Sequence, residues 1–275
     1  MCIRDRIKII LINVIVFVVL SILEVFITLS GGGIIFKTFV NKLMLPAAFT
    51  TFILQPWSLI SYFFLHLSFG HILWNMLFLY WFGKIIHDNI GNNAVISLYV
   101  LGGIIGGLSY MALFNIIPFY GDRVSDSLML GASAGVFSIV AGSATLLPNY
   151  TFHLLFLGPV RIKYIALFYI LLSFLDVTGS NAGGEIAHLG GALIGYLFIR
   201  QLQNGVNMGE GIIKIINIFN KKSSSKIKQD PPINDEVKPD ISQDEIDKIL
   251  DKISESGYSS LSKKEKEKLF NASKK

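Results

Sequence analysis

The sequence predicts an all-α polytopic membrane protein with a small cytoplasmic helical hairpin at its C-terminal end. Of the 275 residues 52% are hydrophobic and only 16% are charged, whereas an average soluble domain carries about 25% charged residues. The charges are also unevenly distributed, because 13 of the 24 basic and 11 of the 19 acidic residues fall in 221–275. Six long apolar stretches precede that segment. These observations exclude an ordinary soluble enzyme and an intrinsically disordered chain.

The six apolar stretches are candidate membrane spans, since a spanning helix needs about 20 mostly apolar residues. They cover about 7–29, 70–87, 93–118, 131–148, 160–176 and 184–203, and so predict a six-helix membrane domain over residues 1–203. The segment 30–69 between the first two spans is apolar but is interrupted by Pro46 and Pro56. We expect it to lie in the membrane interface, packed on the bundle.

Basic residues predict the orientation. Lys8, Lys84, Lys163 and Arg200 all fall at span ends that share one side of the membrane, and an excess of Lys and Arg marks the cytoplasmic side. Both termini are therefore expected in the cytoplasm. The first span is too long for the apolar core of a signal peptide, and no targeting peptide is recognised. We expect a multi-pass protein of a bacterial plasma (inner) membrane.

The C-terminal part has a different character. Residues 204–239 are interpreted as a flexible linker, rich in Lys, Ser, Pro and Asp towards its end. Residues 240–275 contain two Ser-x-x-Glu capping boxes, Ser242 to Glu245 and Ser262 to Glu265, which predict a helical hairpin. The hairpin holds no His or Cys, so we expect it to bind a cytoplasmic partner rather than to catalyse a reaction.

Composition also limits the ligands. The net charge of +5 arises at helix ends rather than in one basic patch, so no nucleic-acid partner is predicted. A single cysteine, Cys2, excludes a disulfide framework and any metal site built from several cysteines. We expect no metal and no cofactor.

Four polar residues stand out because polar groups inside a span are costly and mark function. His71 and Asn75 lie one turn apart near the start of the second span, Ser133 near the start of the fourth, and His188 near the start of the sixth. These three spans run in the same direction, so all four residues are expected at one depth near the outer surface. A purely structural role is the alternative for each motif, such as a serine that donates to a carbonyl of its own helix or a glycine stripe that only allows close helix packing.

The four residues match one chemistry when they are taken together. A serine hydroxyl becomes a nucleophile when a base accepts its proton, and His188 is the histidine of the later spans that can do so. His71, Asn75 and the Ser133 backbone N–H can stabilise an oxyanion. Gly191 and Gly195 would let the fourth and sixth spans approach until Ser133 and His188 are within hydrogen-bonding distance.

The set resembles the rhomboid family of intramembrane serine proteases. The motifs are Gly70-His71 with Asn75, preceded by His66, then Gly131-Ala132-Ser133, and Ala187-His188-Leu189-Gly190-Gly191. The resemblance covers about residues 50–203. It implies a six-helix rhomboid-like bundle, a Ser133–His188 catalytic dyad, oxyanion donors at His71, Asn75 and Ser133, and no metal. It also implies cleavage within or beside transmembrane helices of protein substrates in the lipid bilayer, and an aromatic ring, Phe137, stacked on the catalytic histidine.

Two departures from the family pattern are visible. The family's Trp-Arg pair appears as Trp57-Ser58, and the glycine that usually follows the catalytic serine is Ala134. Two other functions remain alternatives: a catalytically inactive rhomboid-like protein that binds membrane clients, and a small transporter. We interpret Glu185, three residues before His188, as a first-turn carboxylate stabilised by the helix dipole rather than as the third member of a triad.

Overall fold

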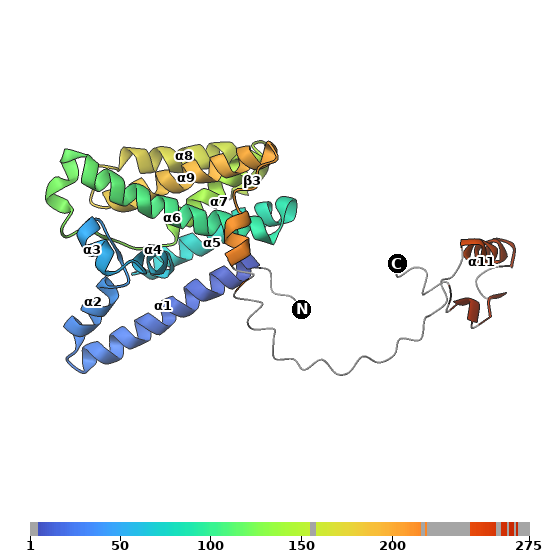
Figure 1. The fold of residues 1–275 in the computed structure, drawn as a ribbon, viewed down its shortest axis with the longest axis horizontal. Helices are drawn as coiled ribbons and strands as arrows, with labels where there is room; N and C mark the ends of the chain where they lie inside the picture. The colour runs from blue at the N-terminus through green and yellow to red at the C-terminus, as the bar shows by residue number, and fades with distance from the viewer. Residues whose placement is uncertain are drawn as a thin grey trace. The chain divides into compact units, whose positions relative to one another are not determined.

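The structure is a computed structural model that describes residues 5–154, 158–215, 218, 243–256, 260–262, 264–266 and 268. The chain divides into two compact units, residues 1–220 and residues 221–275. The first unit contains the long helices, drawn from blue to orange in Figure 1.

Six helices of the first unit lie in the six ranges that the sequence predicts as spans. They are α1 (Asp5–Leu29), α5 (Phe69–Ile90), α6 (Asn92–Ile116), α7 (Ser133–Leu146), α8 (Ile162–Leu175) and α9 (Ala182–Gln203). Within the described residues, α1, α6 and α9 are long and apolar enough to cross a membrane, and α5 meets that criterion together with the short helices before it, from which it is bent by 94°. Helices α7 and α8 are apolar but have 14 residues each.

The centre of the first unit is built from α6, α7 and α9, which pack closely enough to require glycine at several positions. A Cβ atom at Gly191 would lie 2.1 Å from the carbonyl oxygen of Ala134, and one at Gly195 would lie 2.1 Å from that of Ser138. On α6, a Cβ atom at Gly106 would lie 2.6 Å from the Cβ atom of Ala134. Small residues at helix contacts allow this approach, and the predicted close contact of α7 with α9 is confirmed.

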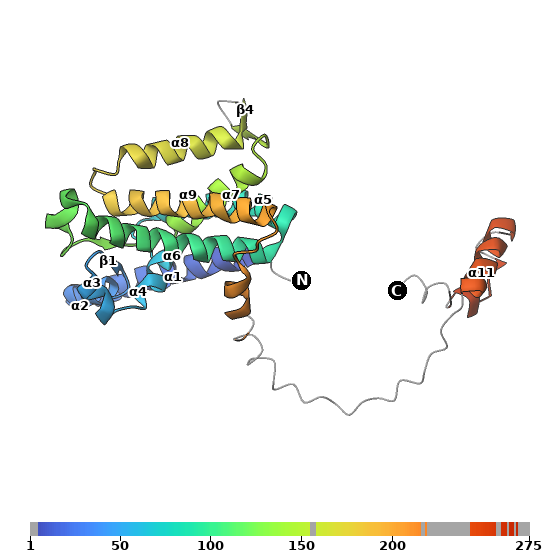
Figure 2. The same cartoon turned by 45° about the horizontal axis from the view of Figure 1, so that its top comes forward.

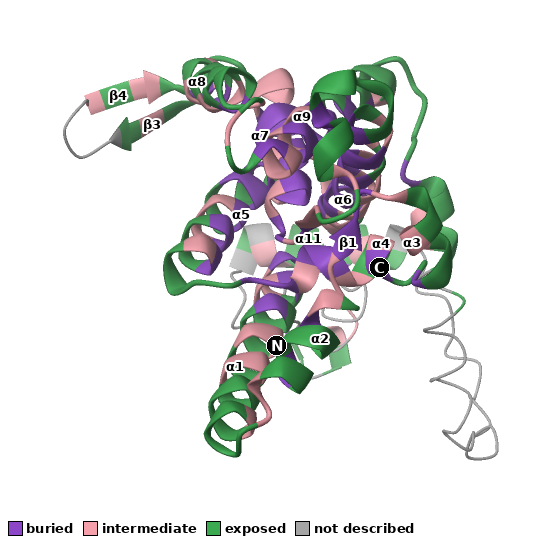
Figure 3. Ribbon diagram, turned by 90° about the vertical axis from the view of Figure 1, so that its left-hand side faces the viewer, coloured by how far each residue is buried: buried purple, intermediate pink, exposed green. Residues whose placement is uncertain are grey.

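Burial decreases from α7 outwards. Nine of the 14 residues of α7 are buried, whereas α8 buries only Ile162, Ala166 and Ser173. Figure 3 shows the same contrast, with purple concentrated on α6 and α7 and green along α1. Figure 2 shows α8 running alongside α9 at the edge of the unit. The exposed side chains of α1 and α8 are largely Leu, Ile, Val and Phe, which suits a surface that faces lipid tails.

The segment 30–69, which the sequence predicts as an apolar loop interrupted by prolines, forms short helices. They are α2 (Gly33–Asn41), α3 (Phe49–Leu54), α4 (Ser58–Ser61) and the 3₁₀ turn η1 (Tyr62–Phe64). Ile34 and Leu54 are 84% and 76% exposed, while Tyr62 is buried and its hydroxyl donates to the carbonyl oxygen of Gly103 at 2.6 Å. Exposed apolar side chains around a buried anchor suit a segment that packs on the bundle within the membrane interface.

Two small antiparallel sheets connect the helices. Strand β1 (Leu45–Pro46) pairs with β2 (Leu128–Met129), with Leu45 opposite Met129. This pairing fixes the 30–69 segment to the chain just before α7, after the 3₁₀ helix η2 (Pro118–Arg123). Strands β3 (Thr151–Leu154) and β4 (Gly158–Arg161) form a hairpin between α7 and α8 that the sequence analysis did not predict.

The first unit extends beyond residue 203. Residues 210–215 are helical, and the hydroxyl of Ser97 on α6 donates to the carbonyl oxygen of Gly209 at 3.5 Å. The beginning of the range predicted as a linker, 204–239, therefore packs on α6. The remainder of that range, 219–239, lies outside the described residues.

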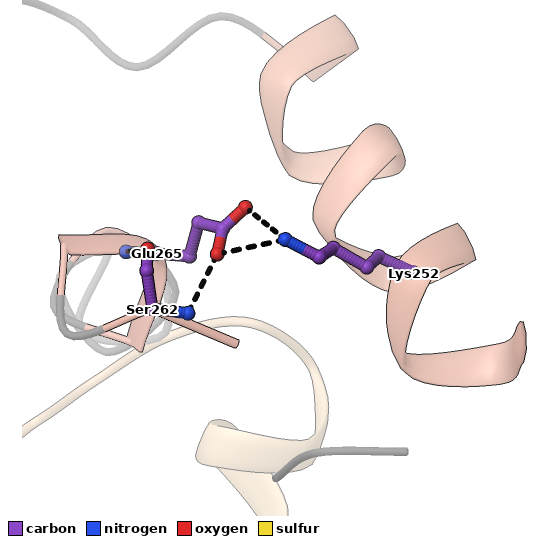
Figure 4. Close-up of polar contacts among 3 residues, drawn as sticks. All are labelled: Lys252, Ser262 and Glu265. Carbon is purple, nitrogen blue, oxygen red and sulfur yellow. Dashed lines mark hydrogen bonds and ion pairs between the residues drawn. The ribbon is translucent and has the colours of Figure 1, made fainter. Parts of the chain in front are cut away.

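The second unit contains helix α11 (Gln243–Ser256) and a helical segment at 264–266. The Ser262 backbone N–H donates to Glu265 Oε2 at 2.7 Å, and the Glu265 N–H donates to Ser262 Oγ at 3.3 Å. This reciprocal pair is a capping box, as predicted, whereas Ser242 of the other predicted box lies outside the described residues. Lys252 of α11 binds the same carboxylate at 2.9 Å (Figure 4).

Candidate active site

Ser133 is the first residue of α7 and lies where the chain enters the most buried helix of the unit. The first intrahelical hydrogen bond of α7 runs from the Val136 N–H to the carbonyl oxygen of Ala132. The N–H of Ser133 therefore has no acceptor within its own helix and lies at the positive end of the helix dipole. A nucleophile at this position has a backbone donor beside it that can bind a developing oxyanion.

His188 lies in the second turn of α9, and its ring is held on one face by an aromatic side chain. The rings of Phe137 and His188 are stacked, with centroids 4.2 Å apart and planes 8° apart. Phe137 follows Ser133 by one helical turn, so the stack also fixes His188 against the nucleophile's helix. The sequence-based expectation for Phe137 agrees with this geometry.

The structure brings the four predicted residues together around one cavity. Ser133, His188, His71 and Asn75 all line a cavity of about 550 Å³ between α5, α7, α8 and α9. Among the described hydrogen bonds none joins Ser133 directly to His188. The sequence predicts that the two residues lie within hydrogen-bonding distance, whereas the described part of the structure shows no such bond and shows both residues lining the same cavity. Catalytic hydrogen bonds are often longer before substrate binds.

Gly131 is required beside the side chain of His71, which lines the cavity. Its φ angle is +125°, a backbone conformation that side chains other than hydrogen strongly disfavour. A Cβ atom there would lie 2.9 Å from His71 Cε1. The Asn75 side chain donates one amide hydrogen to the His71 carbonyl oxygen at 3.0 Å, which leaves its second N–H for another acceptor.

His66 supports this side of the cavity by packing. Its ring meets that of His71 edge to face, with centroids 5.0 Å apart. His66 is buried, and within the described part of the chain neither of its ring nitrogens has a hydrogen-bond partner. The structure therefore places it against an oxyanion candidate rather than in the cavity with the nucleophile.

The Nδ1 side of His188 differs from the sequence-based interpretation. Glu185 Oε2 lies 3.1 Å from His188 Nδ1, and Ser173 Oγ of α8 lies 3.1 Å from the same nitrogen. Glu185 was expected to interact with the helix dipole alone, and the observed contact corrects that expectation. Residues three apart on a helix face the same side, which permits the contact.

Two residues around Glu185 and His188, Ser173 and Asn181, were not recognised from the sequence. Ser173 is a polar residue in the otherwise apolar C-terminal half of α8, and Asn181, which precedes α9, donates from Nδ2 to Glu185 Oε1 at 3.1 Å. Ser173 carried a signal, because a buried hydroxyl in an apolar helix requires a partner. Asn181 did not, since asparagine before a helix is ordinarily a cap.

The structure explains one of the two departures from the family pattern. The Cβ atom of Ala134 faces Gly106 of α6, where the missing side chain leaves room for it. Ser58, the other departure, is fully buried, and nothing in the structure explains why it stands in place of arginine. Its neighbour Trp57 donates from Nε1 to the carbonyl oxygen of Lys42 at 2.8 Å. Within the described residues no group of three or more His, Cys, Asp or Glu side chains is placed to hold a metal ion.

Comparison with known proteins agrees with the geometry. The model of the Rhomboid domain matches residues 54–203, the part of the chain that holds the cavity. A second model, a family of unknown function (DUF6576), matches residues 237–275.

Two curated relatives come from Arabidopsis thaliana. RHOMBOID-like protein 12, mitochondrial, is 30% identical over 158 residues, which cover 54% of this chain and 47% of the relative. Rhomboid-like protein 16, chloroplastic, is 26% identical over 159 residues, which cover 54% of this chain and 49% of the relative. The chain thus spans about half the length of these relatives. Because the Rhomboid domain accounts for more than half of the sequence and contains every residue of the cavity discussed above, the chain belongs to the rhomboid family, which includes intramembrane serine proteases.

Proposed function

We propose that this protein is an active intramembrane serine endopeptidase that uses Ser133 as its nucleophile and His188 as its general base. The observation that carries the proposal is the shared cavity, which is lined both by a serine at a helix N-terminus and by a histidine stacked on an aromatic ring. An inactive client-binding relative has no need for a nucleophile, a base and oxyanion donors at one depth.

The residues divide the chemistry of peptide-bond hydrolysis between them. Ser133 Oγ attacks the scissile carbonyl carbon while His188 Nε2 accepts the hydroxyl proton. The new oxyanion is bound by the Ser133 backbone N–H and by His71 and Asn75. His188 then donates the proton to the departing amine, and a water molecule, deprotonated by the same ring, hydrolyses the acyl-enzyme and releases Ser133.

The proposed substrates are transmembrane proteins in the same lipid bilayer. The membrane-embedded fold of the family supports contact with lipid and with membrane-protein substrates, and the cavity lies among helices whose outer surfaces are apolar. A peptide bond within an intact helix cannot enter such a cavity, so the cleaved segment must unwind. No cofactor takes part in the proposed mechanism.

The proposed topology has six spans, with α7 and α8 as short spans and both termini in the cytoplasm. Such a multi-pass arrangement suits the family, and α7 can be short because protein rather than lipid surrounds most of it. The names of the two relatives place them in mitochondria and chloroplasts, so they do not favour the bacterial plasma membrane expected from the sequence. We further propose that residues 240–275 form a helical hairpin that docks a cytoplasmic partner.

A fluorophosphonate probe tests the mechanism, because an activated serine displaces its fluoride and retains the phosphonate covalently. The purified protein in detergent should be labelled and should cleave a transmembrane substrate. Ser133→Ala should abolish both activities, and His188→Ala should nearly do so. His71→Ala and Asn75→Ala should each slow cleavage about 10²–10³-fold at most, the cost of losing one oxyanion donor.

Ser143→Ala is the matched control, since this α7 hydroxyl donates to the carbonyl oxygen of Phe82 away from the cavity. It should keep labelling and cleavage. An unlabelled wild-type protein that still binds transmembrane helices would instead indicate the inactive client-binding function. Labelling that survives Ser133→Ala would show that Ser133 is not the nucleophile.

A further inference from the structure

We infer that Glu185 is a positioning residue for His188, which this chain adds to the Ser133–His188 dyad. This inference rests on the proposed function and deepens it. It starts from the two atoms 3.1 Å apart, Glu185 Oε2 and His188 Nδ1. Each side chain is largely buried, with exposed fractions of 15% and 14%, so water competes little for the contact.

The contact fixes the tautomer of the imidazole. An ionised carboxylate has acceptors only, so a hydrogen bond to Glu185 requires the hydrogen of neutral His188 to reside on Nδ1. The lone pair is then on Nε2, the nitrogen that must accept the proton of Ser133. When that proton arrives, the imidazolium stays next to a negative charge, which favours the transition state over the resting state.

Glu185 is itself held from its other oxygen. Asn181 Nδ2 donates to Glu185 Oε1 at 3.1 Å, which leaves Oε2 aimed at His188. Asn181, Glu185 and His188 are spaced four and three residues apart, so they lie on one face of the helix. A first-turn carboxylate that is stabilised only by the helix dipole would not need a side-chain donor on one oxygen and an imidazole on the other.

Ser173 provides a second acceptor for the same hydrogen. Its Oγ atom lies 3.1 Å from His188 Nδ1, and it belongs to α8 rather than α9. Loss of Glu185 alone therefore leaves one acceptor for the Nδ1 hydrogen. Loss of the orienting carboxylate lowers kcat about 10⁴-fold in a serine protease triad, and with Ser173 still present we expect a smaller fall, of about 10²-fold.

The test uses the full-length protein and measures kcat and KM for a transmembrane substrate. Glu185→Gln should lower kcat about 10²-fold with little change in KM, and Glu185→Asp should recover part of the loss. Ser173→Ala should cost less than Glu185→Gln, and the double variant should cost more than either. Asp176→Asn removes a negative charge from the same cavity without touching the Nδ1 contact, and so measures how much of the loss is due to charge alone.

A second background separates positioning from stability. If Glu185 acts through His188, Glu185→Gln should cause no further loss in a His188→Ala protein, as measured over long incubations. The inference is wrong if Glu185→Gln keeps kcat within about twofold of wild type, or if its loss is the same size in both backgrounds. If fluorophosphonate does not label the wild-type protein, the proposed function is wrong and this inference falls with it. That outcome is seen in the wild-type protein alone, so it is distinguished from a failure of the Glu185 inference.

Discussion

Gly131 shows how a single residue shapes the proposed oxyanion site. It combines a φ angle of +125° with a position where an added Cβ atom would press on the His71 ring at 2.9 Å. The backbone conformation and the close contact independently demand glycine. The residue therefore sets the distance between the chain before α7 and the side chain that is proposed to bind the oxyanion.

Gly131→Ala should consequently impair catalysis more than folding. The strained backbone is expected to cost about 1–3 kcal/mol of stability, which a folded membrane domain can tolerate, while the displaced His71 ring should lower the cleavage rate at least tenfold, about the scale of a weakened oxyanion donor. Cleavage rates and thermal unfolding in detergent measure the two effects. Gly121→Ala is the control, because its added Cβ atom meets open space. A Gly131→Ala protein that cleaves at the wild-type rate would show that His71 is not held by this contact.

At this scale the sequence predicted which residues form the site better than it predicted how their side chains are oriented. Ser133, His188, His71 and Asn75 could be grouped because helix direction alone sets their depth. The role of Glu185 could not be predicted in the same way. A spacing of three residues allows contact with His188 and equally allows a rotamer directed at the helix N-terminus. The choice depends on Asn181 and on Ser173 of α8, and the position of Ser173 follows from tertiary packing.

At the scale of elements, helix ends carry much of the local chemistry. The segment that begins at Ser262 is stabilised by a capping box and by Lys252 from α11 (Figure 4). The Ser262 backbone N–H, followed by the Lys252 ammonium group, lowers the pKa of the Glu265 carboxyl to about 2 from its ordinary value of 4.5. The ionised carboxylate is thus bound more tightly in the folded unit than in the unfolded chain.

This pKa shift predicts how the C-terminal unit responds to acid. A group whose pKa is lower in the folded state stabilises that state fully above its unfolded pKa and loses its contribution as pH falls through the folded value. The helical circular dichroism of a peptide of residues 237–275 should therefore hold above about pH 4.5 and decline towards pH 2. Glu265→Gln should reduce helicity at pH 7 and flatten the decline. Equal helicity of both peptides at every pH would show that Glu265 does not contribute to the stability of the unit.

At the scale of the whole first unit, hydropathy predicted where helices occur but not how they end. Each of the six apolar ranges contains a helix, because an apolar stretch of that length has few other ways to satisfy its backbone in a membrane. The β3–β4 hairpin was missed, since Thr151 to Arg161 carries a weak strand pattern beside two strong helical ones. The 30–69 segment was predicted as an interfacial loop, but its short helices depend on contacts such as Tyr62 with α6.

The orientation of the six helices is the remaining prediction, and it decides from which side substrate segments reach the cavity. Ser133 and the exposed Ser125 lie towards one end of α7, whereas the exposed Asn149 follows its other end. Basic residues near the second end predict that this end lies in the cytoplasm. In a Cys2→Ser background expressed in intact cells, Ser125→Cys should react with an impermeant thiol reagent, while Asn149→Cys should react only after the membrane is opened. Labelling of both after opening checks that each cysteine is accessible. The reverse pattern in intact cells would show that the orientation is the opposite of the predicted one. The mouth of the cavity, with Ser133 and His188, would then lie on the cytoplasmic side.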